Sequence, residues 1–135
     1  LLTTTLLLSQ QSNYSEEINS PVPSVSPGFV KRAEEFIDAN ADRPITIEDL
    51  SAYAGVSTRS LFAGFKKYRN TTPMAHLRFV RMRRAHRDLQ SPPDKNTTVT
   101  EIALNWGFAH LGRFTAEYRK MFGESPSETL RLARR

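Results

Sequence analysis

The strongest constraint on this chain is an internal repeat. A shift of 52 residues superposes apolar positions and a glycine, namely Ile47 on Val99, Leu50 on Ile102 and Gly55 on Gly107. Beyond the glycine the shift becomes 53, and the matched positions are Leu61 with Phe114, Phe65 with Tyr118 and Pro73 with Pro126. The same supersecondary unit is therefore present twice, and the second copy carries one extra residue near its turn.

Each copy begins with a short helix that ends at a glycine turn. Thr46 to Asp49 and Thr98 to Glu101 both have the form of a capping box, in which two side chains satisfy free backbone N–H groups. Gly55 and Gly107 follow, and glycine is the residue that a turn with positive φ favours. The pattern predicts a helix, a tight turn and a second helix in each copy.

The second helices are predicted over about 58–68 and 110–121. Pro73 and Pro126 then occupy first helical positions, where a missing N–H costs nothing. The helix from Pro73 to about Gln90 links the two copies. No segment alternates convincingly at period two, so the predicted fold class is all-α. Helical spacing places these residues inward: Ile47, Leu50, Tyr53, Leu61, Phe65, Tyr68, Leu77, Val80, Leu89, Trp106, Phe114, Tyr118 and Met121.

Positive charge is concentrated in the repeated part of the chain. All 19 Lys and Arg residues lie at or after Lys31, and residues 28–135 hold 12 acids, a net charge of +7. From Arg59 to Arg87 there are nine basic residues and no acid. Such a stretch on a helical scaffold is the electrostatic footprint of a polyanion binder, although a solvated basic face has the same composition.

Several classes of site are excluded by composition. The chain has no Cys, and its three histidines share no ligand spacing, so we expect no metal site and no cofactor. Paired carboxylates, a nucleophile with a base and a Gly-rich phosphate loop are also missing, which predicts that the protein is not an enzyme. The apolar run Leu6–Leu8 is too short to cross a membrane. A reducing, cytoplasmic location is expected.

Two helix-turn-helix units joined by a basic helix predict a protein that binds double-stranded DNA. One copy would be weak evidence, because helix hairpins with a turn glycine are common. The 18 residues from Pro73 to Gln90 span roughly 27 Å as a helix, which approaches the ~34 Å between successive turns of a major groove. Both second helices are therefore expected to reach one face of a duplex.

From about residue 28 to its end, the chain resembles the DNA-binding domain of the AraC/XylS transcription regulators. The resemblance is carried by Ile47–Leu61, and most specifically by Glu101–Tyr118 and Met121–Pro126, whose Gly-Phe and Phe-Gly-x-Ser-Pro elements lie at the family's spacing. The segment His110–Phe114 is most similar to the XylS-like branch, whose members respond to aromatic acids.

The resemblance implies seven helices in two tandem helix-turn-helix subdomains, about 46–68 and 98–122, joined by the long linking helix at about 73–90. It also implies tandem direct half-sites upstream of promoters and activation by contact with RNA polymerase. Family members usually carry a separate effector domain, through which a homodimer would form. Residues 1–27 are then the expected linker and tail of that domain, and 28–135 the DNA-binding domain.

The first candidate recognition helix presents Arg59 and Ala63 outward, because both lie about 200° from Leu61 around the helix axis. Arg59 is a candidate to pair bidentately with guanine, and a surface arginine without a partner is the alternative. Ala63 occupies a position that the family often fills with a polar reader, and an alanine there can contact only a thymine methyl group or leave room.

The second candidate recognition helix presents Gly112, Arg113 and Ala116 outward. By resemblance, Arg113 matches a base-reading position of the XylS-like branch, whereas Ala116 lacks the side chain that this branch tends to use. The second half-site is therefore expected to be read mainly through Arg113 and DNA shape. His110, near the helix start, is a candidate phosphate contact, with a capping or packing role as the alternative.

Candidate phosphate contacts form a larger group of hydroxyl, imidazole and cationic side chains: Ser57, Thr58, Lys66, Lys67, His110, Arg119 and Lys120. Backbone N–H groups at the helix starts near Thr46 and Thr98 are further candidates. On the linking helix, one side carries Arg78, Arg81 and Arg84, which are expected to face either DNA or water.

Two other functions fit parts of this pattern. The first is a helical protein-interaction module whose basic face binds an acidic partner, and the doubled turn motif argues against it. The second is a binder of RNA or DNA without sequence preference, and the scarcity of exposed aromatic residues for base stacking argues against that.

Overall fold

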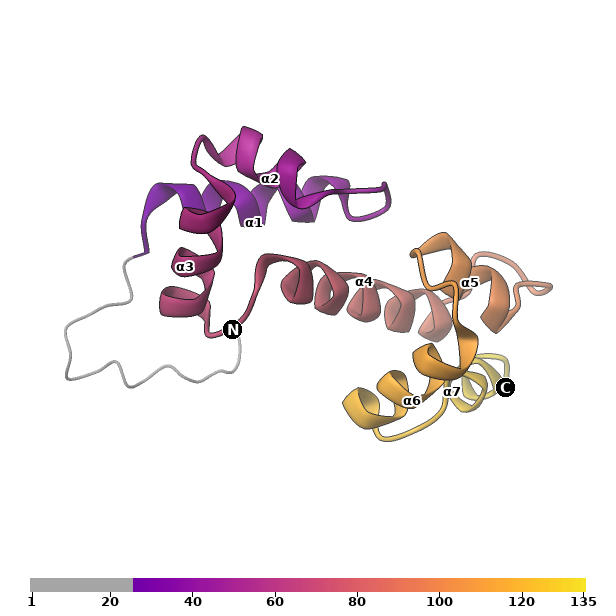
Figure 1. Ribbon diagram of the computed structural model, residues 1–135. Helices are drawn as coiled ribbons and strands as arrows, with labels where there is room; N and C mark the ends of the chain where they lie inside the picture. The colour runs from indigo at the N-terminus through magenta and orange to yellow at the C-terminus, as the bar shows by residue number, and fades with distance from the viewer. Residues whose placement is uncertain (1–25) are drawn as a thin grey trace.

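A computed structural model describes residues 26–135 of the chain, and within this range it consists of helices and connecting loops without strands (Figure 1). The helices are α1 (Gly28–Asn40), α2 (Ile47–Ala54), α3 (Thr58–Arg69), α4 (Pro73–Gln90), α5 (Val99–Asn105), α6 (Leu111–Phe122) and α7 (Pro126–Ala133). The all-α, seven-helix prediction is therefore confirmed. The expected tail lies almost entirely outside the described residues.

Two separate hydrophobic cores divide the fold into two subdomains. The first core joins α1, α2 and α3, with Ile37, Leu50, Leu61 and Phe65 fully buried. The second joins α5, α6 and α7, and its largest buried side chain is that of Tyr118. As Figure 1 shows, α4 extends between the two subdomains. It contributes to both cores, because Leu77 belongs to the first and Met82, Ala85 and Leu89 belong to the second.

The local signals that punctuate each repeat act as expected. Thr46 and Asp49 exchange two hydrogen bonds of 3.0 Å, and Thr98 and Glu101 exchange two of 3.0 and 3.1 Å, so both capping boxes are formed. Gly55 has φ of 78° and Gly107 has φ of 84°, a region that other residues rarely adopt. In each helix-turn-helix, the turn therefore depends on a glycine that adopts a positive φ.

Two residues expected in the core are exposed instead. Tyr53 is 52% exposed, because α2 packs through Leu50 and Ala54 and leaves the tyrosine ring beside Phe36 at the surface. Met121 is 40% exposed, because the inward stripe of α6 continues from Tyr118 to Phe122, four residues on. Both predictions were wrong at the last turn of a helix, where the inward face is narrow.

Along residues 26–135, no helix combines the length and the apolar character needed to cross a bilayer.

Candidate nucleic-acid interface

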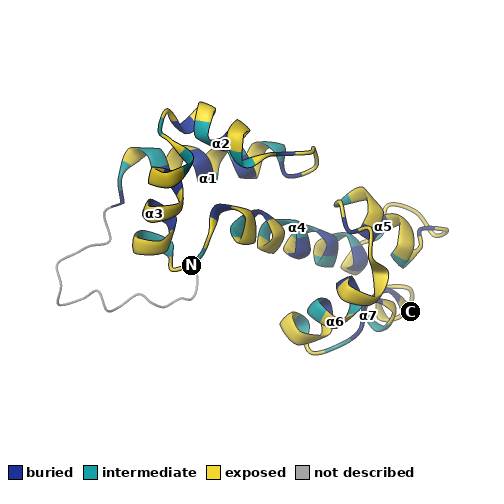
Figure 2. Ribbon diagram, in the orientation of Figure 1, coloured by how far each residue is buried: buried dark blue, intermediate teal, exposed yellow. Residues whose placement is uncertain are grey.

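The outward face of α3 is set by close packing of its inward face on α1. Leu61, Gly64 and Phe65 are buried. A Cβ atom on Gly64 would lie 2.6 Å from the ring of Phe29, so any larger residue would force that ring to shift. The opposite face is exposed in Figure 2, and it carries Arg59 as predicted. Ala63, one turn further along α3, is also exposed.

The N-terminus of α3 is capped by the side chain of Ser57. The Ser57 hydroxyl accepts a hydrogen bond of 3.1 Å from the backbone N–H of Ser60 and contacts the Ser60 hydroxyl at 3.1 Å. Ser57 is exposed and Thr58 is half-buried. Ser57 therefore has a structural role already, and its predicted phosphate contact would be an addition to that role.

The outward face of α6 is lined by small residues. Gly112, Arg113 and Ala116 are exposed, while Phe114 and Tyr118 on the opposite side are buried. A Cβ atom on Gly112 would meet nothing within 4 Å, and its φ is not positive, so the folded protein gives no steric reason for glycine. A shallow hollow of about 510 Å³ lies on this face, lined by Gly112, Thr115, Ala116, Arg119 and Lys120.

Both candidate recognition helices have charges that favour an external anion. The first turns of α3 and α6 carry no acidic residue, a feature shared with α1 and α4, whereas those of α2, α5 and α7 carry acids that compete for the free N–H groups. The last turns are basic, with Lys66, Lys67 and Arg69 in α3 and Arg119 and Lys120 in α6.

The cations on these two faces are left without carboxylate partners inside the described part of the chain. Ion pairs there join Arg69 to Glu34 at 2.6 Å, Arg78 to Glu117 at 2.7 Å and Arg87 to Asp88 at 3.6 Å. The predicted base readers, Arg59 and Arg113, belong to none of them. Neither do the predicted phosphate contacts Lys66, Lys67, Arg119 and Lys120.

His110 occupies the N-cap position of α6. Its side chain is exposed and makes no capping hydrogen bond. The packing alternative is therefore wrong, and the capping alternative holds only for the position of the residue and not for its side chain. Its contact with phosphate stays a prediction.

The three arginines on one side of α4 have partners within the protein. Arg78 pairs with Glu117 on α6, Arg81 donates to the carbonyl of Ala41, and Arg84 donates to the carbonyl of Asp38. The Arg78 side chain is still 43% exposed to solvent, whereas Arg81 and Arg84 are half-buried. A contact of any of the three with DNA stays a prediction. Nothing in the local sequence pattern indicates such distant partners.

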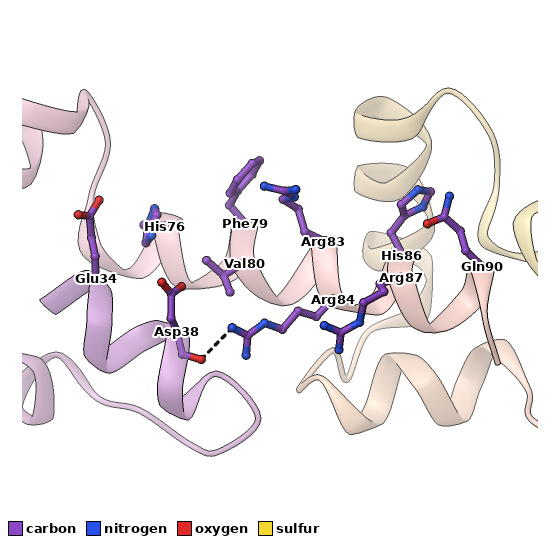
Figure 3. Close-up of a pocket in the computed structure, with 10 residues that line it drawn as sticks. All are labelled: Glu34, Asp38, His76, Phe79, Val80, Arg83, Arg84, His86, Arg87 and Gln90. Atoms are coloured by element: carbon purple, nitrogen blue, oxygen red, sulfur yellow. Dashed lines mark hydrogen bonds between the residues drawn. The ribbon is translucent and has the colours of Figure 1, made fainter. Parts of the chain in front are cut away.

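A cavity of about 690 Å³ lies along α4 beside α1, and Figure 3 shows the residues of these two helices that line it. Its wall includes the acidic residues Glu34 and Asp38 as well as Arg83, Arg84 and Arg87. Because charges of both signs line this cavity and none of its lining residues belongs to α3 or α6, we do not count it as part of the candidate interface.

Comparison with known proteins places the chain among bacterial regulators. Residues 50–132 match the family described as a helix-turn-helix domain. The chain is 42% identical over 126 residues to the "Probable thc operon regulatory protein" of Rhodococcus erythropolis, covering 93% of this chain and 38% of that protein. It is 38% identical over 138 residues to the "XylDLEGF operon transcriptional activator 2" of Pseudomonas putida, covering 98% of this chain and 82% of that protein.

The fold leads to the same group. A probable AraC family transcriptional regulator from Rhodopseudomonas palustris has a TM-score of 0.75 and 48% sequence identity, over 79% of this chain and 98% of that one. The match thus covers nearly the whole length of the solved AraC-type domain, whereas this chain spans little more than a third of the Rhodococcus protein. The repeat, the two exposed recognition helices and these matches together show that the chain belongs to the AraC/XylS family of DNA-binding transcription regulators, which are not enzymes.

Proposed function

We propose that the chain reads tandem half-sites in double-stranded DNA by placing α3 and α6 in successive major grooves. The observation that carries this proposal is the same on both helices. Each presents one arginine without a carboxylate partner, Arg59 or Arg113, beside an alanine that leaves the groove-facing surface open. A guanidinium in such a setting is suited to bidentate pairing with guanine.

Phosphate contacts position the protein in this proposal. Lys66, Lys67, Arg119 and Lys120 flank the arginines on the same two helices, and Ser57, Thr58 and His110 lie at the helix starts. Contacts of this kind bind all sequences alike and release counterions, so they give affinity and salt dependence without specificity.

The wider role is proposed from the relatives. The Pseudomonas putida protein is named a transcriptional activator, and we infer that this chain activates transcription by contact with RNA polymerase, in the cytoplasm. As the family resemblance implies, we propose that effector binding and homodimer formation are functions of a separate domain and not of α1 to α7.

The proposal is tested by selecting bound duplexes from a random pool and titrating the protein with the selected duplex and a scrambled one at several salt concentrations. We expect tighter binding to the selected duplex by a factor of at least about 10³ at physiological salt. Equal affinities, within about threefold, would show that the protein does not read sequence. Preferential binding to single strands or to RNA would favour the alternative without groove recognition.

A further inference from the structure

Arg81 of the linking helix contacts parts of both subdomains. Its Nε donates to the carbonyl of Ala41 at 2.8 Å, and its Nη2 donates to the carbonyl of Arg43 at 2.6 Å, both in the loop after α1. Its Nη1 lies 3.4 Å from the position that a Cβ atom would take on Gly107. One guanidinium therefore lies between the first subdomain and the glycine turn of the second helix-turn-helix.

Arg84, almost one turn further along α4, repeats this bridging arrangement. Its Nη2 donates to the carbonyl of Asp38 at 2.8 Å, the bond drawn in Figure 3. The same guanidinium lies over the ring of Trp106, 5.9 Å from the ring centroid. Trp106 is half-buried, packs against both hydrophobic cores and donates from its ring N–H to Asp88 at 2.8 Å. The side chain expected in one core thus lies at the junction of two.

The backbone carbonyls of Asp38 and Ala41 are free to accept hydrogen bonds from these arginines because of their position at the end of α1. Asp38 lies in the last turn of α1 and Ala41 is its C-cap, where carbonyl groups have no partner within the helix and carry partial negative charge. An arginine presents several N–H groups in a fixed planar fork, so one side chain can hold two such carbonyls at a defined angle. Burial lowers the pKa of Arg81, yet the group stays charged at any physiological pH.

We propose that Arg81 and Arg84 are positioning residues, which fix the angle and distance between α3 and α6 by tying α1 and the second glycine turn to the same face of α4. The part of the inference that concerns DNA rests on the proposed function. It states that these two residues set the spacing of half-sites that the protein accepts.

The geometric part is tested without DNA. The chain has no cysteine, so Lys67→Cys with Lys120→Cys attaches one spin label to α3 and one to α6. Pulsed electron paramagnetic resonance then gives the distribution of distances between the labels. We compare Arg81→Gln/Arg84→Gln with Arg83→Gln/Arg87→Gln, which removes the same charge from exposed positions of α4. The variant Arg81→Gln/Arg84→Gln, called the clamp variant below, is expected to broaden the distribution of label distances about twofold or more. The control variant Arg83→Gln/Arg87→Gln is expected to leave it unchanged. Equal widths in both would overturn the proposal.

Arg81→Lys tests the same inference if the double variant unfolds in a thermal melt. A lysine keeps the charge but has no planar fork with which to hold both carbonyls, so broadening is expected here as well. A distribution as narrow as that of the unmodified arginine would overturn the proposal.

The DNA part uses the unlabelled protein and duplexes with the selected spacing or with one additional base pair. The insertion rotates the second half-site by about 34° and shifts it by about 3.4 Å. The affinity ratio between the two duplexes is expected to fall by about threefold or more in the clamp variant, and to stay at its original value in the control variant. An unchanged ratio would overturn the link to spacing. If the unmodified protein prefers neither selected nor scrambled DNA, the proposed function fails, and the label distances still decide the geometric inference.

Discussion

The two helix-turn-helix units share a scaffold but present their arginines in different registers. When Leu61 is aligned with Phe114, Arg59 falls on Gly112, and Arg113 falls on Ser60. The two arginines are thus one residue apart on equivalent helices, which turns them about 100° relative to each other around the helix axis. If α3 and α6 dock alike, the two half-sites are read at different base-pair positions. An internal repeat in the protein does not require an identical repeat in the DNA.

The cores of the two units differ in a corresponding way. Phe65 in the first unit is matched by Tyr118 in the second, and each faces a histidine of α4. Tyr118 donates to the hydroxyl of Thr129 at 2.7 Å, and His86 Nδ1 lies 2.7 Å from the tyrosine oxygen. At Phe65 the first unit therefore packs on α4 through ring contact alone. At Tyr118 the second unit has hydrogen bonds to His86 and Thr129 as well.

The largest expected effect comes from removing the arginines one at a time. Arg59→Ala and Arg113→Ala should each weaken binding to the selected duplex by on the order of 1–3 kcal/mol and relax preference at one half-site only. Competition titrations against duplexes altered at single positions measure both effects. Lys66→Ala and Lys120→Ala serve as controls, since each should weaken all sequences alike and reduce the salt slope by about one. Uniform losses from the arginine variants would show that the base readers lie elsewhere.

Moving the arginine of α6 by one residue tests the difference in register between the two helices. Gly112→Arg combined with Arg113→Ser gives α6 the arginine position of α3. We expect the preferred position in the second half-site to move toward that of the first, as measured by a new selection from a random pool. Retention of the original second half-site would contradict the register difference.

Removal of the hydroxyl of Tyr118 makes the second core resemble the first. Tyr118→Phe leaves His86 Nδ1 and Thr129 each without one hydrogen bond, so the free energy of unfolding should fall by about 1–2 kcal/mol. Urea denaturation measures the change. Tyr53→Phe is the matched control, because that ring is half-exposed and its loss of a hydroxyl should change stability by no more than about 0.5 kcal/mol.

The comparison also separates what the sequence predicts from what it does not. Helix positions, caps and turn glycines were predictable because each depends on residues within one or two turns, such as Thr98 and Glu101. The outward direction of Arg59 and Arg113 follows from the same helical period. The bonds of Arg81 and Arg84 join residues 40 and 46 positions apart and depend on how α1 folds back over α4. No local periodicity contains that information.

Glycines at two places in the repeat should respond in opposite ways. Gly112→Ala should raise the free energy of unfolding by a few tenths to about 1 kcal/mol, because alanine favours a helix and its Cβ meets nothing. Gly55→Ala should lower it, because φ is 78° there. If DNA approaches the hollow on α6 closely, the same Gly112→Ala variant binds the selected duplex more weakly although it is more stable. Unchanged affinity would place the DNA backbone away from this residue.

The smallest expected effect is a pH dependence to which both units contribute. Burial lowers the pKa of His76, beside Phe65, and of His86, beside Tyr118, below the ordinary value of 6.5. Each histidine then takes up its proton more readily in the unfolded chain, so acidification favours unfolding. Stability is complete above about pH 6.5 and is lost as the pH falls from there through the lower pKa values of the folded protein. Urea denaturation between pH 8 and 5.5 should show this loss, and His76→Gln and His86→Gln should each flatten part of it. A loss between pH 8 and 5.5 that persists undiminished in the double variant would show that neither histidine causes it. Glu128 does not contribute in this window, because its hydrogen bonds to Ser125 lower its pKa below the ordinary value and it titrates in a more acidic range.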